Sequence, residues 1–199
     1  MTDFNLDQFY KDEFEEHKAV LELTQTHIQT SFKSLLEMCA TCIQNGKKIL
    51  FFGNGGSAGD AQHLATELVV RYHKNRAPIA AIALTTDTSA LTAIGNDLGF
   101  EELFSRQIEA LGNPGDIAIG ITTSGKSKNV IKGFEMAKRK GLFTAAFTGN
   151  GGGDLHGGLA DPMIIVPSKT TARIQEMHIL IGQMLCDALE KELKMETYE

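Results

Sequence analysis

His63 and Glu67 are the residues of this sequence whose types and spacing most directly suggest chemistry. They lie four residues apart in the stretch "AGDAQHLATELVV", so a helix would place both side chains on one face. An imidazole and a carboxylate at this spacing can share a metal ion such as Zn²⁺ or act together as an acid and a base. The alternative is structural, because an isolated pair of this kind is more often a surface ion pair or involves a histidine held in the core.

Three glycine-containing loops could bind a phosphate group. Residues 53–57 read "GNGGS", residues 122–127 read "TTSGKS" and residues 149–153 read "GNGGG". Glycines let the backbone approach a ligand closely, and hydroxyls can hydrogen-bond to phosphate oxygens. The third loop has neither a hydroxyl nor a cation, and any single glycine loop is more often a tight turn. Two hydroxyl-bearing loops after separate strands of one sheet favour a shared anionic ligand.

The second of these loops also fits the Walker A pattern. Residues 120–127 read "GITTSGKS" and follow the apolar run "DIAIG". A P-loop enzyme needs, in addition, an acidic residue at the end of another strand to organise Mg²⁺. None of the runs "LFTAAFTGN", "IAAIALTT" and "PMIIVPS" ends in one. We therefore interpret the match as coincidental and the loop as a site that can bind a sugar phosphate without a metal.

Two further groups of polar residues could contribute to a site. Gln175, Glu176 and His178 open an otherwise apolar helix at "IQEMHILIG", where polar residues usually line an interface or a site. Asn96 and Asp97 lie between two glycines and indicate a helix break. Their side chains either reach a ligand or form a plain Asx turn, and the sequence favours neither.

The hydrophobic pattern predicts the elements that must position these residues. Residues 3–45 repeat apolar side chains at helical spacing, and Gly46 is suited to end that segment. After it, five short apolar strands alternate with helices: "KKILFF", "IAAIAL", "DIAIGIT", "LFTAAFT" and "PMIIVP". This alternation predicts an α/β fold with a five-stranded parallel sheet covered by helices on both faces. Residues 1–199 then form one domain, with two N-terminal helices (1–46) before an α/β core and closing helix (47–199).

Composition and charge exclude several classes of protein. The chain has 199 residues, 42% of them apolar, which suits one globular domain, and its formal net charge of −6 disfavours nucleic acid as the main ligand. No apolar run approaches the ~20 residues of a membrane helix, and the acidic N-terminus lacks a signal-peptide core, so we expect a cytoplasmic protein. Cys39 and Cys42 form a C-x-x-C late in a predicted helix, which favours buried thiols over redox chemistry.

Four stretches together resemble one known family: "GNGGSAGDAQHLATEL", "ALTTDTSALTAIGNDLGF", "GITTSGKS" and "TARIQEMHILI". They occur in the order found in the sugar isomerase (SIS) domain family, and within it they are most similar to the phosphoheptose isomerases. The resemblance covers essentially the whole chain. It implies a SIS-type, flavodoxin-like three-layer sandwich that assembles as a homotetramer, with active sites at subunit interfaces and one Zn²⁺ per subunit.

The activity implied by this resemblance is aldose–ketose isomerisation. Sedoheptulose 7-phosphate would become D-glycero-D-manno-heptose 7-phosphate through an enediol, in bacterial heptose synthesis for the lipopolysaccharide core or capsule. The family's phosphate loop falls on Thr122, Thr123, Ser124 and Ser127. The remaining substrate-binding residues fall on Asn54, Gly55, Gly56, Ser57, Glu67, Asn96, Asp97 and Gln175. The zinc ligands fall on His63, Glu67, Gln175 and Gln183, and Glu67 would also be the base that removes the C1 proton.

Gln183 departs from the family pattern, which has a histidine there as both metal ligand and catalytic acid/base. Glutamine can offer a carbonyl oxygen to a metal but cannot shuttle a proton near neutral pH. On a helix, Gln183 lies about 80° round the axis from Gln175, and His178 lies about 60° to the other side. His178 is therefore the candidate substitute for the missing acid, alongside Gln183 itself as the occupant of the catalytic position.

Two other interpretations use the same motifs. One SIS relative, the DnaA initiator-associating protein, is a non-enzymatic tetramer that shares "ARIQEMH" and also lacks the fourth histidine. That relative loses the metal-site glutamate and a loop glycine, both present here as Glu67 and Gly56, which favours the enzyme. The remaining alternative is a SIS isomerase of another sugar phosphate, because nothing in the loops counts carbon atoms.

Overall fold

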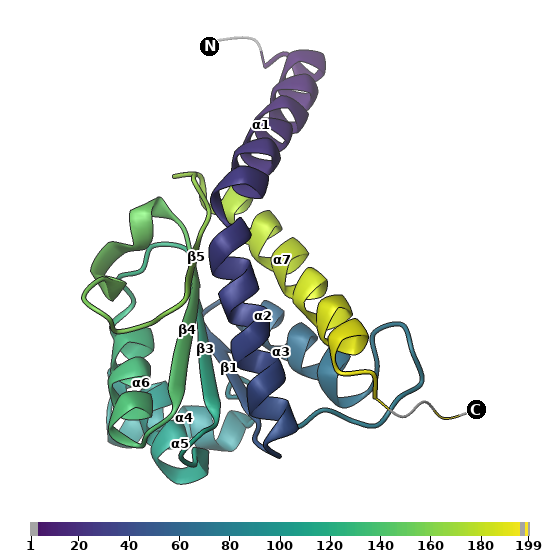
Figure 1. The fold of residues 1–199 in the computed structure, drawn as a ribbon. Helices are drawn as coiled ribbons and strands as arrows, with labels where there is room; N and C mark the ends of the chain where they lie inside the picture. The colour runs from purple at the N-terminus through teal and green to yellow at the C-terminus, as the bar shows by residue number, and fades with distance from the viewer. Residues whose placement is uncertain (1–3, 196–197, 199) are drawn as a thin grey trace.

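A five-stranded sheet forms the centre of the molecule in the computed structural model, which describes residues 4–195 and 198. All neighbouring strands are parallel, in the order β2-β1-β3-β4-β5. The strands are β1 (Ile49–Gly53), β2 (Ala81–Ala83), β3 (Ile117–Thr122), β4 (Phe143–Thr148) and β5 (Met163–Ile165). This is the flavodoxin-like strand order, so the predicted parallel sheet of five strands is confirmed (Figure 1).

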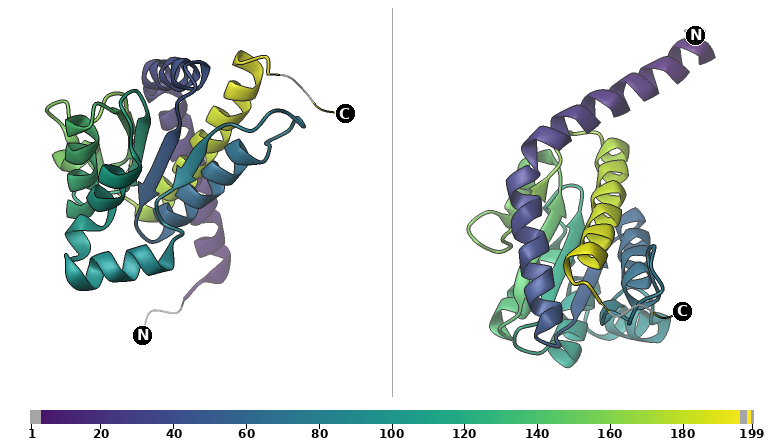
Figure 2. Two further views of the ribbon diagram at one scale, coloured as in Figure 1. Left: turned by 90° about the horizontal axis from the view of Figure 1, so that it is seen from below. Right: turned by 45° about the vertical axis from the view of Figure 1, so that its right-hand side comes forward.

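Seven α-helices and two short 3₁₀ segments complete the described part of the chain. They are α1 (Leu6–His27), α2 (Gln29–Gln44), α3 (Gly56–Val69), α4 (Thr88–Asp97), η1 (Phe100–Glu102), α5 (Leu103–Leu111), α6 (Lys128–Arg139), η2 (Asn150–Leu155) and α7 (Thr171–Glu192). Helices α2, α3 and α7 lie on one face of the sheet, and α4, α5 and α6 lie on the other (Figure 2). The predicted three-layer arrangement is therefore confirmed.

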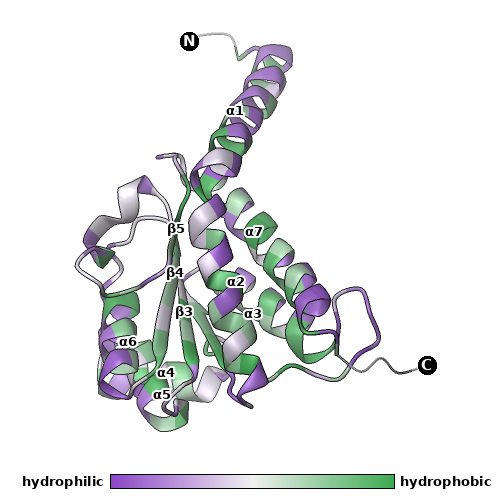
Figure 3. Cartoon of the chain, in the orientation of Figure 1, coloured by the Kyte–Doolittle hydropathy of each residue, from purple (hydrophilic) through white to green (hydrophobic). Residues whose placement is uncertain are grey.

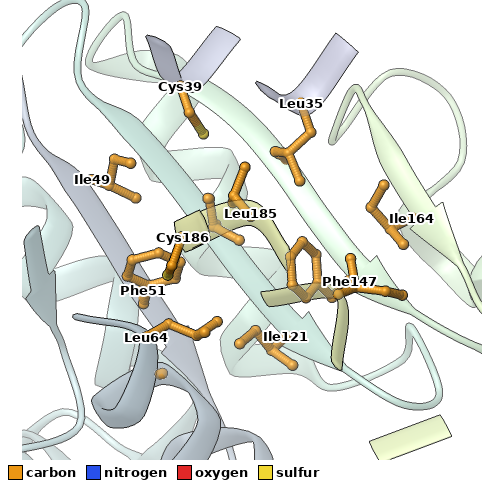
Figure 4. Packing of buried hydrophobic residues seen from close by; sticks show 14 of the residues in the cluster. Leu35, Cys39, Ile49, Phe51, Leu64, Ile121, Phe147, Ile164, Leu185 and Cys186 are labelled. Atoms are coloured by element: carbon orange, nitrogen blue, oxygen red, sulfur yellow. The ribbon is translucent and has the colours of Figure 1, made fainter. Parts of the chain in front are cut away.

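Alternate strand residues build two separate cores, because successive side chains of a strand point to opposite faces. Ile49 and Phe51 pack with α2, α3 and α7, as Figure 4 shows around Leu64 and Leu185. Leu50 and Phe52 pack instead with α4, α5 and α6. Since β1 is buried on both faces, its sequence is a continuous apolar run rather than an alternating one.

The N-terminal helical segment divides into a docked helix and a projecting one. Helix α2 packs on the sheet and ends near Gly46, whose φ of +67° is the left-handed conformation that favours glycine. Most of α1 extends away from the body of the molecule (Figure 1), and its surface mixes apolar and polar residues along its length (Figure 3). Phe9, Tyr10 and Phe14 on this helix are exposed, so residues 4–195 of one chain leave an apolar surface of α1 uncovered.

Three smaller expectations can be compared with the structure. The two sheet-edge strands are shorter than their apolar runs, because β2 and β5 each have only one neighbour to set their pairing. Cys39 and Cys42 are buried thiols of α2, as predicted, and burial raises the pKa of Cys42 to about 11. No helix among the described residues is long and apolar enough to cross a membrane.

Candidate active site

The first two predicted loops meet at the carboxyl ends of adjacent strands. Strands β1 and β3 pair directly, with Gly53 opposite Ile121. Asn54, just after β1, and Asn129, in the first turn of α6, exchange two amide hydrogen bonds of 2.9 and 2.8 Å. Because Asn129 is only 3% exposed, this reciprocal pair fixes the two loops relative to each other.

The hydroxyl-rich loop leads directly into the N-terminus of α6. Thr122 is 4% exposed, and its hydroxyl lies 3.4 Å from that of Ser127, the N-cap residue. The Ser124 hydroxyl accepts a hydrogen bond from the backbone N–H of Lys126 at 3.2 Å. Ser127 makes no capping hydrogen bond to its own helix. Free backbone N–H groups and hydroxyls at a helix N-terminus can bind an anion such as phosphate.

The third glycine loop supports the second. A Cβ atom placed on Gly125 would lie 2.2 Å from the carbonyl oxygen of Gly152, and Gly125 has a φ of +65°. The backbone N–H of Asp154 also donates to the Gly125 carbonyl at 3.0 Å. Residues 152–154 thus brace the hydroxyl-rich loop through their backbone, so this support needs neither a hydroxyl nor a cation.

His63 and Glu67 lie on one face of α3, as their spacing predicts. The His63 Nε2 atom lies 3.1 Å from Oε1 of Glu67, and the side chains are 47% and 23% exposed. Near the start of the same helix, the amide of Gln175 lies against Gly56, since a Cβ there would be 2.4 Å from its Nε2. Helix α7 therefore brings Gln175 to the start of the helix that carries His63 and Glu67.

Gln183 lies on α7 beside the same helix. A Cβ atom on Gly182, its neighbour in sequence, would lie 2.5 Å from Cδ2 of Leu64, which follows His63. The position is partly exposed. Gln175 and the residue before Gln183 thus contact α3, the helix that carries His63 and Glu67.

His178 occupies the protein interior. Its exposed fraction is 0%, and neither ring nitrogen has a hydrogen-bond partner among the described residues. Burial lowers its pKa to about 4; a backbone group of Thr148 offsets part of that shift, but its geometry falls short of a hydrogen bond. The ring instead packs near Phe147, at 6.0 Å between centroids. A buried neutral imidazole argues against the predicted role of His178 as an acid that meets the substrate.

Asn96 and Asp97 are not joined to the two loops within one chain. They are the last residues of α4, on the opposite side of the sheet from α3 and α7, and both are exposed. The Asn96 amide donates to the Asp97 carboxylate at 2.7 Å. In the part of the chain that the structure describes, no hydrogen bond links either side chain to residues 53–57 or 122–127. Their place in the site stays a prediction.

Two residues of this region were not predicted from the sequence. Asn129 is one, because its link to Asn54 spans 75 positions and leaves no local pattern. Asp60 is the other: it lies one turn before His63, and its Oδ2 atom is buried without a partner. Burial raises the pKa of Asp60, and the nearby His63 offsets part of this effect. The spacing of residues 56, 60, 63 and 67 on one helical face was the signal that could have identified Asp60.

Among the described residues, no group of three or more His, Cys, Asp or Glu side chains could hold a metal ion. The predicted zinc ligands are a different kind of set, with one imidazole, one carboxylate and the amides of Gln175 and Gln183. Structural and catalytic zinc sites are mostly built from Cys, His and carboxylate ligands. His63 and Glu67 fit that chemistry, whereas each amide would offer only a neutral oxygen.

Similarity to known proteins supports one family. A model of the SIS domain family matches residues 13–149. The phosphoheptose isomerase of Paramagnetospirillum magneticum is 58% identical over 182 residues, which cover 92% of this chain and 94% of that protein. The phosphoheptose isomerase of Helicobacter pylori strain P12 is 50% identical over 186 residues, covering 94% and 96% respectively.

Solved structures agree with this assignment at the level of the fold and the sequence. The phosphoheptose isomerase GmhA from Neisseria gonorrhoeae superposes with a TM-score of 0.89 at 41% identity, covering 94% of this chain and 100% of that one. A phosphoheptose isomerase from Francisella tularensis superposes with a TM-score of 0.88 at 34% identity and the same coverage. The similarity to both structures therefore extends over 94% of this chain.

Proposed function

The chain belongs to the phosphoheptose isomerases of the SIS domain family, and from that premise we propose that it converts sedoheptulose 7-phosphate to D-glycero-D-manno-heptose 7-phosphate. The observation that carries this proposal is the pair of hydrogen bonds between Asn54 and Asn129, which joins two loops at the ends of adjacent strands. One loop offers hydroxyls at a helix N-terminus, and the other begins the helix with His63 and Glu67. A phosphate anchor and a carboxylate base on the adjoining unit are what an enediol mechanism on a sugar phosphate needs.

The proposed reaction follows from this division. Thr122, Ser124 and Ser127 hold the phosphate and so fix the sugar in one orientation. The Glu67 carboxylate then removes the C1 proton of the ketose, and an enediol forms. Return of a proton to C2 gives the aldose, so the carbonyl moves from C2 to C1 without a net redox change. Because His178 is buried, another group must exchange protons with the sugar oxygens. We assign this acid role to a water molecule held by Gln183 or to a neighbouring group.

We also propose Zn²⁺ as the cofactor, held by His63, Glu67 and the amide oxygens of Gln175 and Gln183. The 3.1 Å between His63 Nε2 and Glu67 Oε1 is close to the separation of about 3.3 Å expected for two ligands of one tetrahedral zinc ion. When bound, the ion would stabilise negative charge on the sugar oxygens. With two amides in the set, we expect weaker zinc binding than a site with a second histidine would give.

We propose a homotetramer with sites at subunit interfaces as the working form. The support is the projecting helix α1, whose exposed aromatic residues, Phe9, Tyr10 and Phe14, find no cover within one chain. A second copy would bury them. Light scattering across a concentration series tests this proposal, and a monomer at micromolar concentration would contradict it. The heptose would supply lipopolysaccharide or capsule synthesis, and we place the enzyme in the cytoplasm.

The experiment that tests the activity uses the protein and its Gln183→His variant. Each is incubated with sedoheptulose 7-phosphate, with Zn²⁺ or with a chelator, and aldose formation is followed by NMR. Turnover by the protein with Zn²⁺ is the expected result. Turnover by the variant alone would make this chain an isomerase scaffold disabled at one position. Absence of turnover in both proteins, although both are folded, would overturn the proposal. It would favour a binding protein similar to the SIS relative that associates with the DnaA initiator.

A further inference from the structure

A fully buried ion pair joins the loop after α3 to α7. The Arg76 Nε donates to Oε1 of Glu190 at 3.0 Å, and each side chain is 1% exposed. Glu190 also accepts three consecutive backbone N–H groups, from Tyr72, His73 and Lys74, at 2.8 to 3.1 Å. Burial raises the pKa of the Glu190 carboxyl, but these N–H groups and Arg76 outweigh it, so the net shift is downward. This carboxylate is charged and saturated with donors.

The guanidinium of Arg76 uses its other nitrogens on the end of α3. Its Nη2 donates to the backbone carbonyl of Glu67 at 2.9 Å, and its Nη1 donates to the carbonyl of Leu68 at 2.9 Å. The last carbonyls of a helix have no partner within the helix, so Arg76 supplies the missing donors. The residue whose carbonyl it caps, Glu67, is the proposed base.

Helices α3 and α7 run in the same direction and touch at three levels. Gln175 lies against Gly56 at their first turns, and Gly182 lies against Leu64 in the middle. At the far end, Glu190 reaches Arg76 and through it the carbonyls of Glu67 and Leu68. Packing at the first two levels resists approach of the helices. The ion pair opposes sliding of one helix along the other, because directional hydrogen bonds hold both helix ends to one guanidinium.

We propose that Arg76 and Glu190 are positioning residues for catalysis, which set the axial register between α3, with His63 and Glu67, and α7, with Gln175 and Gln183. This inference rests on the proposed function for those four side chains. Neither Arg76 nor Glu190 touches the substrate. A displacement of about 1 Å between reacting groups can reduce a rate about 10²-fold, so loss of the register would lower kcat while the separate hydroxyl-rich loop keeps KM.

The test compares two buried carboxylates with similar surroundings. Glu190→Gln removes the charge beside Arg76, and Asp116→Asn does the same beside Lys48, just before β3 and β1. Asp116 is a matched control because its side chain is 2% exposed, pairs with Lys48 and accepts backbone N–H groups from Lys48 and Asn113. We expect about a 10²-fold loss of kcat in Glu190→Gln with KM within about twofold. We expect kcat of the Asp116→Asn variant to stay near that of the parent.

Arg76→Lys is the milder variant, in case Glu190→Gln does not fold. Lysine keeps the charge but lacks the planar fork that reaches Glu190 and two carbonyls at once, so we expect a tenfold or larger loss of kcat, again at constant KM. Equal losses of kcat in Glu190→Gln and Asp116→Asn would overturn the proposal. A kcat equal to that of the parent in both Glu190→Gln and Arg76→Lys would also overturn it.

Amide hydrogen exchange separates failure of this inference from failure of the proposed function. Should the parent protein not isomerise the sugar, the register can still be measured through the protection of residues 64–70 at the end of α3. Faster exchange there in Glu190→Gln and Arg76→Lys, but not in Asp116→Asn, supports the positioning role. Unchanged exchange at that helix end in all three variants contradicts it, whatever the turnover.

Discussion

The β1–α3 and β3–α6 units have the same architecture but use it in opposite ways. Each runs from a buried strand through a glycine loop into a helix, and the two loops are joined by Asn54 and Asn129. In β3–α6 the polar groups precede the helix, and α6 then buries Val130, Phe134 and Ala137. In β1–α3 the reactive side chains lie further along, at His63 and Glu67, where α7 packs beside them.

This difference indicates how binding and chemistry are separated. A helix N-terminus offers N–H groups that suit a fixed anion, so we propose β3–α6 as the anchoring unit. Carboxylate and imidazole side chains two to three turns into α3 can face a bound sugar at a distance from its phosphate. Changes in β1–α3 should therefore lower kcat, and changes in β3–α6 should raise KM. The predictions below test each unit, helix α7 beside the first unit, and the contact that joins the two units.

The largest loss of kcat is expected when Glu67, the proposed base on α3, is replaced. Glu67→Gln keeps the shape and the hydrogen-bonding capacity toward His63 but removes the base, so we expect kcat to fall about 10³-fold with KM within about threefold. Steady-state kinetics with sedoheptulose 7-phosphate measure both constants. Glu37→Gln, which alters an exposed i,i+4 pair with Lys33 on α2, is the control. Parent-like turnover in Glu67→Gln would exclude this residue from the mechanism.

The second effect concerns α7, which packs beside the chemical unit. Because the pKa of His178 is lowered to about 4 in the fold, the unfolded chain takes up a proton first as the pH falls. The free energy of unfolding is therefore not reduced by His178 above pH 6.5, and it falls by about 3 kcal/mol as the pH drops toward 4. Denaturant unfolding at pH 7 and 4.5 should show most of this loss in the parent and in His27→Gln, an exposed histidine. The loss should be much smaller in His178→Phe, where carboxylates with a lowered pKa, such as Asp116 and Glu190, still contribute. The same pH dependence in His178→Phe would contradict the assignment.

A third prediction breaks the joint between the two units. Asn129→Ala leaves the half-buried amide of Asn54 without its two hydrogen bonds, so we expect a loss of about 1 kcal/mol or more in the free energy of unfolding. Both kcat and KM should change, because the two loops are no longer held in a fixed position relative to each other. Asn45→Ala removes an exposed amide bonded to the Thr41 carbonyl and should cost less than about 0.5 kcal/mol. Altered KM alone in Asn129→Ala would mean that the joint serves only the anchor.

The smallest effect is expected at the anchor. Ser124→Ala removes one hydroxyl from the hydroxyl-rich loop, and a hydrogen bond to a charged group contributes about 1.5 kcal/mol or more. KM should rise about tenfold, with kcat within about twofold. Inorganic phosphate inhibition should weaken by the same factor, which separates phosphate binding from sugar binding. A KM equal to that of the parent would place the phosphate elsewhere.

Local patterns in the sequence were enough to predict the strands, the helices and the loops between them. The i,i+4 spacing placed His63 and Glu67 on one face, and the buried thiols of α2 followed from the helical pattern. Contacts between distant segments could not be predicted, because Asn54 and Asn129, or Arg76 and Glu190, leave no periodic signal. His178 shows the limit for single residues: its position on α7 was predicted, but its burial depends on how that helix packs against β4.

The contact between residues 125 and 152–153 limits which substitutions the hydroxyl-rich loop can accept. At most tight places in a protein, a larger side chain can be offset by a smaller one opposite. Here backbone meets backbone: a Cβ on Gly125 would lie 2.2 Å from the Gly152 carbonyl oxygen, and a Cβ on Gly153 would lie 2.3 Å from that of Ser124. Both contacts are made by backbone carbonyl groups, so a smaller side chain opposite cannot relieve them. A larger residue at position 125 or 153 therefore requires a change in the backbone of residues 124–125 or 152–153.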